Sequence, residues 1–284
     1  MSSAAQSLAD AAGQVTVEIA PSGPWRGVNL RELWEYRELL QILVWRDLKV
    51  RYRQTALGAL WVMGQPLLFT LLFTLVFNRL ARIDIPGLPY AAYALAGLLP
   101  WNFFSAGVMA AANSLVGNAS LITKVYFPRV LVPAAGVLGA LADLGVAALL
   151  LAAVLAWYGI VPSGNVVLLP LVVLLAAALT LGLGLWLAAL NVKYRDVRVV
   201  IPFALQVWMY ATPVVYPLQL LPQPWRSLAQ FNPALGVVEG FRWCVFGGPA
   251  PLLALGVTLA AAAALIASGV LVFRRMEREF VDVI

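Results

Sequence analysis

The stretch Asn118-Ala-Ser-Leu-Ile-Thr-Lys-Val-Tyr-Phe-Pro-Arg129 lies between two long apolar segments, and the rest of the chain is organised around it. It carries two cations, Lys124 and Arg129. Between them stands the apolar and aromatic sequence Val125-Tyr126-Phe127, which a fully solvated loop has no reason to keep. The stretch therefore has the composition of a contact surface rather than of a simple connection.

Pro128 lacks a backbone donor and disfavours a helical conformation at the residue before it, so a helix in this loop ends just before the proline. We predict a short helix over 118–127 that lies across the mouth of a membrane bundle and presents Tyr126 and Phe127 to a partner. The alternative is a hydrophilic turn whose two cations fix the membrane topology.

The composition indicates that lipid is the main solvent of this chain. Of its 284 residues 62% are hydrophobic and 11% are charged, and the mean hydropathy is +0.88. A soluble domain carries about a quarter charged residues. Histidine is absent and Cys244 is the one cysteine, which excludes an internal disulfide, most zinc sites and Ser-His or Cys-His catalysis.

The chain has no nucleotide-binding motif of the P-loop type, in which Gly-Lys-Ser/Thr cradles phosphates. Its lysines, Lys49, Lys124 and Lys193, follow Leu, Thr and Val. It also lacks the internal repeats and multiple intramembrane acids that are typical of ion-coupled carriers. We therefore predict that the chain is not an enzyme, that it holds no cofactor or metal of its own, and that energy is supplied by another polypeptide.

Residues 1–24 are small and polar and are expected to be mobile, whereas residues 25–54 predict an amphipathic helix in the membrane interface. Its apolar face is formed by Leu33, Tyr36, Leu40, Leu43 and Val44. Asp47 and Arg51 are spaced to pair along the helix. The charged end of this helix would face anionic headgroups or an acidic partner surface, or would serve only as a solvated topology anchor. Its residues are Arg46, Asp47, Lys49, Arg51 and Arg53.

Six apolar segments near the ~20 residues that a spanning helix requires follow in the region 55–284. They are predicted at about 57–78, 91–115, 132–157, 166–190, 200–216 and 252–273, and the fifth is short and interrupted by Pro202 and Pro213. Pro213 should kink that helix. Fifteen of the nineteen Lys and Arg residues fall in the N-terminal segment, the loops 116–131 and 191–199, and the C-terminal tail. Both termini and the loop 118–129 are therefore predicted to be cytoplasmic.

Asp143 is the acid nearest the centre of a predicted span, and an intramembrane charge is a functional hypothesis by default. The alternative is a structural role, in which Asp143 bonds to a neighbouring helix or to a second copy of the chain. Ala135 and Gly139 precede it by two turns and one turn of helix, respectively, and would allow another helix to approach closely.

Two aromatic series are candidates for lining a passage through the bundle. Residues of the first recur every four positions along the first span, and the second flanks Pro213. Ring faces could stack on flat faces of a substrate without demanding one hydrogen-bond pattern. The alternative is packing or an interfacial belt. The two series are Trp61, Gln65, Phe69, Phe73 and Phe77, and Trp208, Thr212 and Tyr216.

The segment 217–251 is too long for a turn and too apolar for a water-filled loop. Its sequence predicts a short helix containing Trp225, which ends near Gln230, and a second helix capped by Asn232 with Pro233 at its first position. Glu239 and Arg242 are spaced to pair on the second helix. We predict re-entrant helices that form an outer gate; an interfacial hairpin without a gating role is the alternative.

Several motifs resemble the membrane subunit of ABC-2-type polysaccharide exporters, the permeases for O-antigen, capsule or teichoic-acid chains. The resemblance runs from about residue 30 to the C-terminus. The motifs are Trp-Arg-Asp-Leu-Lys-Val-Arg-Tyr-Arg-Gln-Thr-Ala-Leu-Gly-Ala-Leu-Trp (45–61), Gln65-Pro66, Pro100-Trp-Asn-Phe-Phe104, Lys124-Val-Tyr-Phe-Pro-Arg129, Asn191-Val-Lys-Tyr-Arg-Asp196 and Asn232-Pro233.

This resemblance implies an all-α polytopic membrane protein of six spans in the cytoplasmic (inner) membrane, working as a homodimer with two cytoplasmic ATP-binding-cassette subunits that bind Mg-ATP. It implies a lipid-linked, O-antigen-like glycan as the substrate and membrane lipid as the surroundings, with no role for nucleic acid. The implied coupling residues are Thr123, Lys124, Val125, Tyr126, Phe127, Pro128 and Arg129, and the loop with Lys193, Arg195 and Asp196 adds to the cytoplasmic interface.

Two other functions stay open. An ABC-2 exporter of a drug or of a lipid without a glycan would need the same cytoplasmic loops but fewer lining aromatics. An ATP-independent carrier would transport without a partner. A membrane enzyme acting on lipid carriers would need paired acids or a histidine at the interface, which this chain does not offer.

Overall fold

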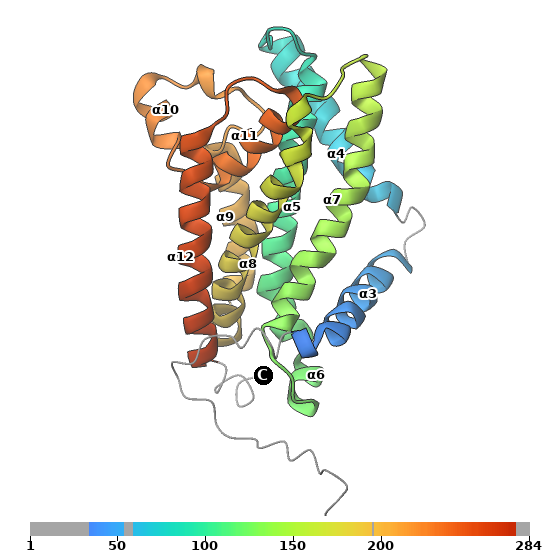
Figure 1. Cartoon of the computed structure of the whole chain (residues 1–284), viewed down its shortest axis with the longest axis vertical. Coiled ribbons are helices and arrows are strands. Elements are labelled where there is room, and N and C mark those ends of the chain that lie inside the picture. Colours follow the sequence, from blue (N-terminus) through green and yellow to red (C-terminus); the bar gives the residue numbers. More distant parts are fainter. Residues whose placement is uncertain (1–33, 54–58, 195, 277–284) are drawn as a thin grey trace, which may run out of the picture.

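The structure is a computed structural model that describes residues 34–53, 59–194 and 196–276. The predictions for residues 1–24, for Leu33 and Arg195, and for the last eight residues of the tail lie outside this part of the chain, as does the side chain of Arg53. The described residues form a helical bundle whose long helices run roughly parallel, with short helices at both ends (Figure 1).

The elements follow one another along the chain without a named strand in the described residues. They are α3 (Arg37–Arg53), α4 (Ala59–Phe73) with its π-helical extension η1 (Thr74–Leu80), α5 (Tyr90–Gly117), α6 (Ala119–Lys124), α7 (Leu131–Trp157), η2 (Gly164–Leu168), α8 (Leu169–Lys193), α9 (Val197–Ala211), η3 (Leu218–Leu220), α10 (Gln223–Ala229), α11 (Pro233–Phe246) and α12 (Leu252–Met276).

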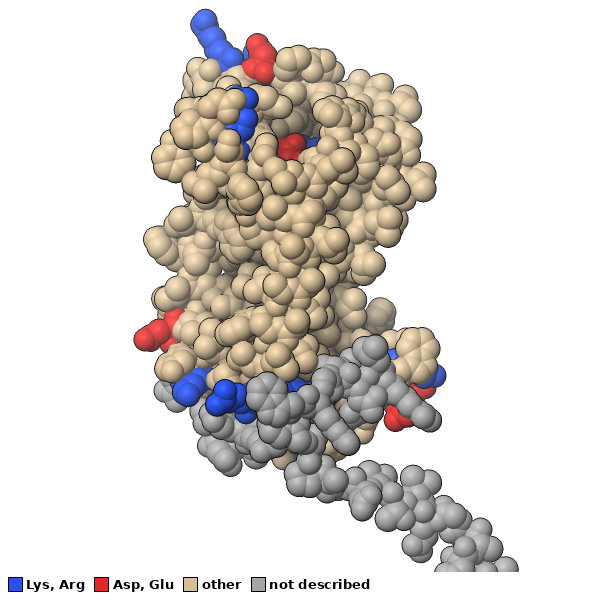
Figure 2. All heavy atoms as spheres, turned by 60° about the vertical axis from the view of Figure 1, so that its left-hand side comes forward, with Lys and Arg blue, Asp and Glu red and all other residues tan. Residues whose placement is uncertain are grey.

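Five helical segments of the described chain are long and apolar enough to cross a membrane. They are α4 with η1, α5, α7, α8 with η2, and α12, and they correspond to five of the six predicted spans. A charge-free middle band fits this assignment, because on the face shown in Figure 2 the charged side chains gather toward the two ends. The protein is a multi-pass membrane protein.

The predicted fifth span differs from the other five. Its helix α9 has 15 residues and ends at Ala211, so at 1.5 Å per residue it covers about 22 Å, less than the ~30 Å hydrocarbon core. Thr212 is extended (φ −103°, ψ 134°), because Pro213 disfavours a helical conformation in the residue before it. The predicted kink at Pro213 is therefore wrong; the proline follows the end of the helix.

Helix α5 forms the centre of the bundle and packs against α4, α7, α8 and α11. Glycines on two neighbours allow this approach: a Cβ at Gly136 of α7 would lie 3.0 Å from the carbonyl carbon of Ala110, and one at Gly184 of α8 would lie 2.5 Å from Cβ of Ala111. Small residues let helix backbones approach closely in a membrane, where packing replaces the hydrophobic effect as the driving force. The same short stretch of α5 therefore holds α7 and α8 together.

A second apolar cluster closes the bundle at the end that carries α6. It joins residues far apart in the sequence, with α3, α5, α6, α8 and α12 all contributing. Its buried members include Leu43, Leu115, Ile122, Phe127, Leu185, Ala188 and Phe273. Around Leu43, the predicted apolar positions Leu40 and Val44 of α3, and Tyr36 just before it, pack against the same cluster, so the predicted apolar face of this helix is the one that contacts the bundle.

Candidate functional site

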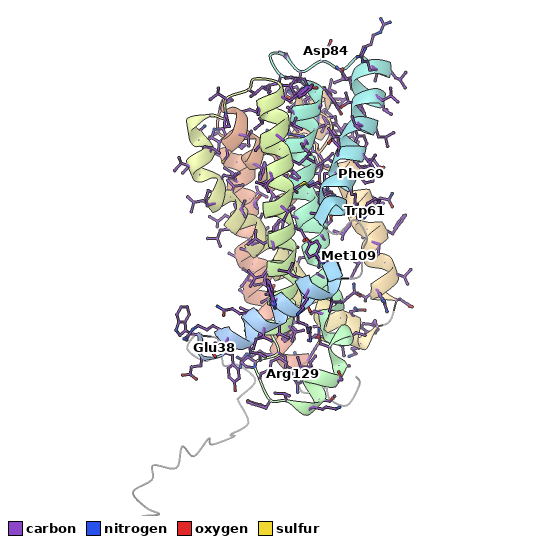
Figure 3. All side chains as sticks on the ribbon, turned by 90° about the vertical axis from the view of Figure 1, so that its right-hand side faces the viewer. Glu38, Trp61, Phe69, Asp84, Met109 and Arg129 are labelled. Atoms are coloured by element: carbon purple, nitrogen blue, oxygen red, sulfur yellow. The ribbon has the colours of Figure 1, made fainter. Side chains whose placement is uncertain are left out.

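A groove of about 570 Å³ lies between α4, α5, α7 and α9, with the end of α3 at one side. In Figure 3, Met109, Trp61 and Phe69 follow one another up this side of the bundle, above the end of α3. Its wall combines aliphatic side chains with aromatic rings and uncharged polar groups. The aromatic residues are Trp61, Phe69, Trp101, Phe103 and Tyr210, and the amides and hydroxyl are Gln65, Asn102, Gln206 and Ser105.

The first aromatic series divides between the groove and the core. Trp61, Gln65 and Phe69 line the groove, whereas Phe73 is buried. The ring of Phe73 lies 6.1 Å from that of Phe69 and 5.9 Å from that of Phe77. Offset rings at such distances stabilise one another. The drift of a four-residue repeat around the helix explains why the far end of the series turns toward α5.

The second series lies beside the groove and connects α9 to α11. Trp208 Nε1 donates to Asn232 Oδ1 at 2.9 Å, and Asn232 Nδ2 donates to the buried Thr212 Oγ1 at 2.8 Å. Tyr216 donates its hydroxyl hydrogen to the carbonyl of Tyr210 at 2.9 Å. These three predicted lining residues therefore make contacts within the chain, which hold the end of α9.

The groove side of α9 is formed by residues that the sequence analysis missed. They are Pro202, Leu205, Gln206, Met209 and Tyr210. Their spacing places them on one face of the helix, with the polar Gln206 among them. This helical periodicity was the sequence signal that could have identified them as lining residues.

At the opposite end from α6, the segment 217–251 forms the short helices α10 and α11, as predicted (Figure 1). Asn232 caps α11 by accepting from Ala234 N at 3.0 Å, Pro233 stands at the first position, and Gly247 ends the helix at φ 80°. Trp225 is exposed on α10. A glycine with positive φ after the last turn commonly ends a helix. The two ends of α11 are therefore determined by capping residues that the sequence shows directly.

Arg242 of α11 is buried, with 4% of its side chain exposed. Its Nη1 donates to Glu239 Oε1 at 2.7 Å, which confirms the predicted pair, and to the carbonyl of Pro213 at 2.9 Å. Its Nη2 donates to the carbonyl of Val214, and its guanidinium lies 3.8 Å from the ring centroid of Tyr93. One side chain thus ties α11 to the segment after α9 and to the first turn of α5.

The loop 118–129 contains a shorter helix than predicted, because α6 ends at Lys124 and Val125 is extended. Thr123, Lys124 and Val125 are exposed, and Tyr126 is exposed by 73%. Phe127, in contrast, is 4% exposed within the cluster with Leu43 and Ile122. The expectation that Phe127 is offered to a partner is therefore wrong: it anchors the loop, while its neighbour faces outward.

The charged end of α3 is divided between two contacts. Arg46 Nη2 donates to Asp47 Oδ1 at 2.7 Å and to Asn118 Oδ1 at 2.6 Å, which connects α3 to the residue that precedes α6. Arg51 forms an ion pair with Asp143 of α7. The predicted pairing of Asp47 with Arg51 is therefore wrong, since each has another partner. Lys49, Lys193 and Asp196 are exposed at this end of the bundle.

Tyr52 completes the contact with α7 by donating its hydroxyl hydrogen to the other oxygen of Asp143. Burial, and then the hydrogen bond to Asp143, raise the pKa of Tyr52 to about 12, so the phenol stays a donor near neutral pH. Asp143 bonds to a neighbouring helix of its own chain, which is one of the two structural alternatives. The guanidinium of Arg51 lies above Gly139, 4.0 Å from the position a Cβ would take there.

Comparison with known proteins places this arrangement in a family. Residues 38–246 match the profile of the ABC-2 type transporter family, a range that extends from α3 to the end of α11 and includes the groove. The chain belongs to the ABC-2 type transporter family. As an ABC-2 permease, it lies in the family of membrane subunits whose ATPase is a separate polypeptide.

The relatives of this permease include polysaccharide exporters. It is 38% identical over 215 residues to an O-antigen export system permease protein from Myxococcus xanthus, covering 75% of this chain and 82% of the relative. It is 25% identical over 248 residues to an O-antigen export permease from Klebsiella pneumoniae (87% and 95%) and 24% identical over 210 residues to a polysialic acid transport protein from Escherichia coli (74% and 81%).

Proposed function

We propose that this permease forms the membrane channel of an ATP-driven exporter that moves a lipid-linked polysaccharide outward, as a homodimer with two ATP-binding-cassette subunits. The observation that carries the proposal is the groove. The wall of the groove combines aromatic rings with amide groups, which suits a polar chain of sugar rings. Relatives of the permease are named for the export of O-antigen and the transport of polysialic acid.

The distribution of charge supports an orientation with α6 in the cytoplasm. Among the described residues, most Lys and Arg belong to segments at the α6 end, such as α3, the loop 118–129 and the last turn of α12, and such residues favour the cytoplasmic side. The end with α10 and α11 would then face outward, where these helices could form the exit of the channel.

A route for mechanical coupling follows from the contacts of the loop 118–129. A partner ATPase that moves on binding ATP would push on α6 and on the exposed Tyr126. Asn118 transmits the displacement to α3 through Arg46, and Phe127 transmits it to the cluster shared with α5, α8 and α12. Because packed helices shift as units rather than deform continuously, a small movement at α6 would reorient the walls of the groove.

Reconstitution tests this function directly. Proteoliposomes containing the permease with its ATPase should transfer a lipid-linked polysaccharide across the bilayer only when ATP is present, as measured by access of an added glycosidase. Permease alone should not transport. Transport without the ATPase would establish an ATP-independent carrier, and equal transport of a lipid without a glycan would favour the other ABC-2 cargo class.

Substitution in the groove gives a second prediction. Trp61→Ala removes an exposed ring from the wall and should lower the export rate about threefold, because an aromatic contact contributes about 0.5–1.5 kcal/mol. Export is to be measured per molecule of inserted permease. The matched control is Trp157→Ala at the end of α7, an exposed tryptophan away from the groove. Equal rates for both variants would contradict a lining role for Trp61.

A further inference from the structure

The ion pair between Arg51 and Asp143 opens into the groove. Both residues belong to its wall, and among the described residues that line it they are the only charged ones. The side chain of Arg51 is 40% exposed and that of Asp143 is 18% exposed. The pair is therefore asymmetric: the carboxylate is largely enclosed, while much of the guanidinium faces open space.

The position of Arg51 in the bundle follows from the position of α3. In Figure 3, α3 rises from Glu38 toward the base of the groove near Met109, and Arg51 lies in its last turn. The guanidinium thus lies at the base of the groove on the α6 side, against Asp143 of the spanning helix α7, where the phosphate of a lipid that entered the groove would reach it.

The chemistry of the pair suits exchange of one anion for another. Guanidinium binds carboxylate and phosphate with the same planar fork of donors, and the contact with Asp143 uses Nη1. If Arg51 turned to another anion, Asp143 would keep the hydrogen bond from Tyr52. The carboxylate would then not be left without a donor, which is the main cost of breaking a partly buried ion pair.

We propose that Arg51 is a binding site for the phosphate of a lipid at the inner mouth of the groove, with Asp143 holding the guanidinium in position until the phosphate displaces it. The inference rests on the proposed function, because it identifies the lipid phosphate of the exported glycan as the ligand. Ordinary anionic phospholipid offers the same chemistry, so the test separates the two sources.

Binding of a polyprenyl diphosphate to the purified full-length permease, in neutral detergent, tests the site without ATPase or export. Arg51→Gln should weaken binding about tenfold, the effect expected for loss of a charge-assisted hydrogen bond, and Arg51→Lys should restore part of it. Asp143→Asn should strengthen binding, since it releases Arg51 from its competitor. The matched control, Arg79→Gln at the opposite end of the bundle, should bind as the wild type does.

A purely structural role for the ion pair makes a different prediction, in which Arg51→Gln and Asp143→Asn both weaken binding. That result, or unchanged binding by Arg51→Gln, would overturn the proposal.

The corresponding polyprenol without phosphate should bind weakly and independently of Arg51. Competition by phosphatidylglycerol at equal concentration would overturn the assignment to the exported lipid. A failed export assay with unaltered Arg51-dependent binding would count against the proposed function alone.

Discussion

Arg242→Met should destabilise the permease by about 3–5 kcal/mol, the cost of removing one partner from a buried ion pair. The substitution keeps an unbranched, largely apolar stem but removes every donor of the guanidinium. Glu239 then loses its cation, and the carbonyls of Pro213 and Val214 lose their donor. Thermal unfolding of the purified protein in detergent measures the effect as a lowered midpoint.

Two variants show whether the effect is specific to this site. Glu239→Gln should cost less, because Arg242 keeps its contacts with the carbonyls and with the Tyr93 ring. Arg226→Met on α10 makes the same chemical change where the guanidinium contacts the carbonyls of Gln219 and Leu221 at the surface, and it should cost about 1 kcal/mol. If Arg242→Met unfolded at the wild-type temperature, the role of Arg242 in attaching α11 to α5 would be refuted.

Helix-capping residues explain what the sequence could predict at the end of the molecule that carries α10 and α11. The cap at Asn232, the proline after it and the glycine at 247 determine α11 through contacts within a few residues of each boundary. The Glu239–Arg242 pair depends only on helical spacing. The other partners of Arg242 could not be predicted, because they are carbonyls brought together by the packing of α5 and of the segment after α9.

The difference between local and tertiary contacts also applies to the loop 118–129 and to the groove. Tyr126 is exposed whereas Phe127 is buried, because Phe127 packs in a cluster with Leu43, a residue of another helix. The partner of Asp143 lies 92 positions earlier in the chain, so spacing could only leave its alternatives open. The four-residue repeat predicted the lining residues of α4, because the whole repeat lies within one helix. Asn102 of α5 and Tyr210 of α9 line the groove only through tertiary packing.

Separate substitution of the two aromatic residues in the loop 118–129 should have opposite results. Phe127→Ala should lower stability by about 3 kcal/mol, since a buried ring leaves a cavity. Tyr126→Ala removes an exposed ring and should change stability by less than about 0.5 kcal/mol. In the proposed complex it should weaken binding of the ATPase by about tenfold or more, because tyrosine is enriched at the centres of interfaces, and ATP-dependent export should fall with it.

Thermal unfolding, ATPase affinity and export therefore have to be measured on each single variant, since a double substitution would mix lost stability with lost coupling. The matched control is Tyr158→Ala, which removes a partly exposed tyrosine at the far end of α7 and should leave affinity for the ATPase unchanged. Wild-type affinity and export by Tyr126→Ala would refute the coupling surface. A stable Phe127→Ala variant would show instead that the cluster around Leu43 tolerates the cavity, and that the loop is held by its other contacts.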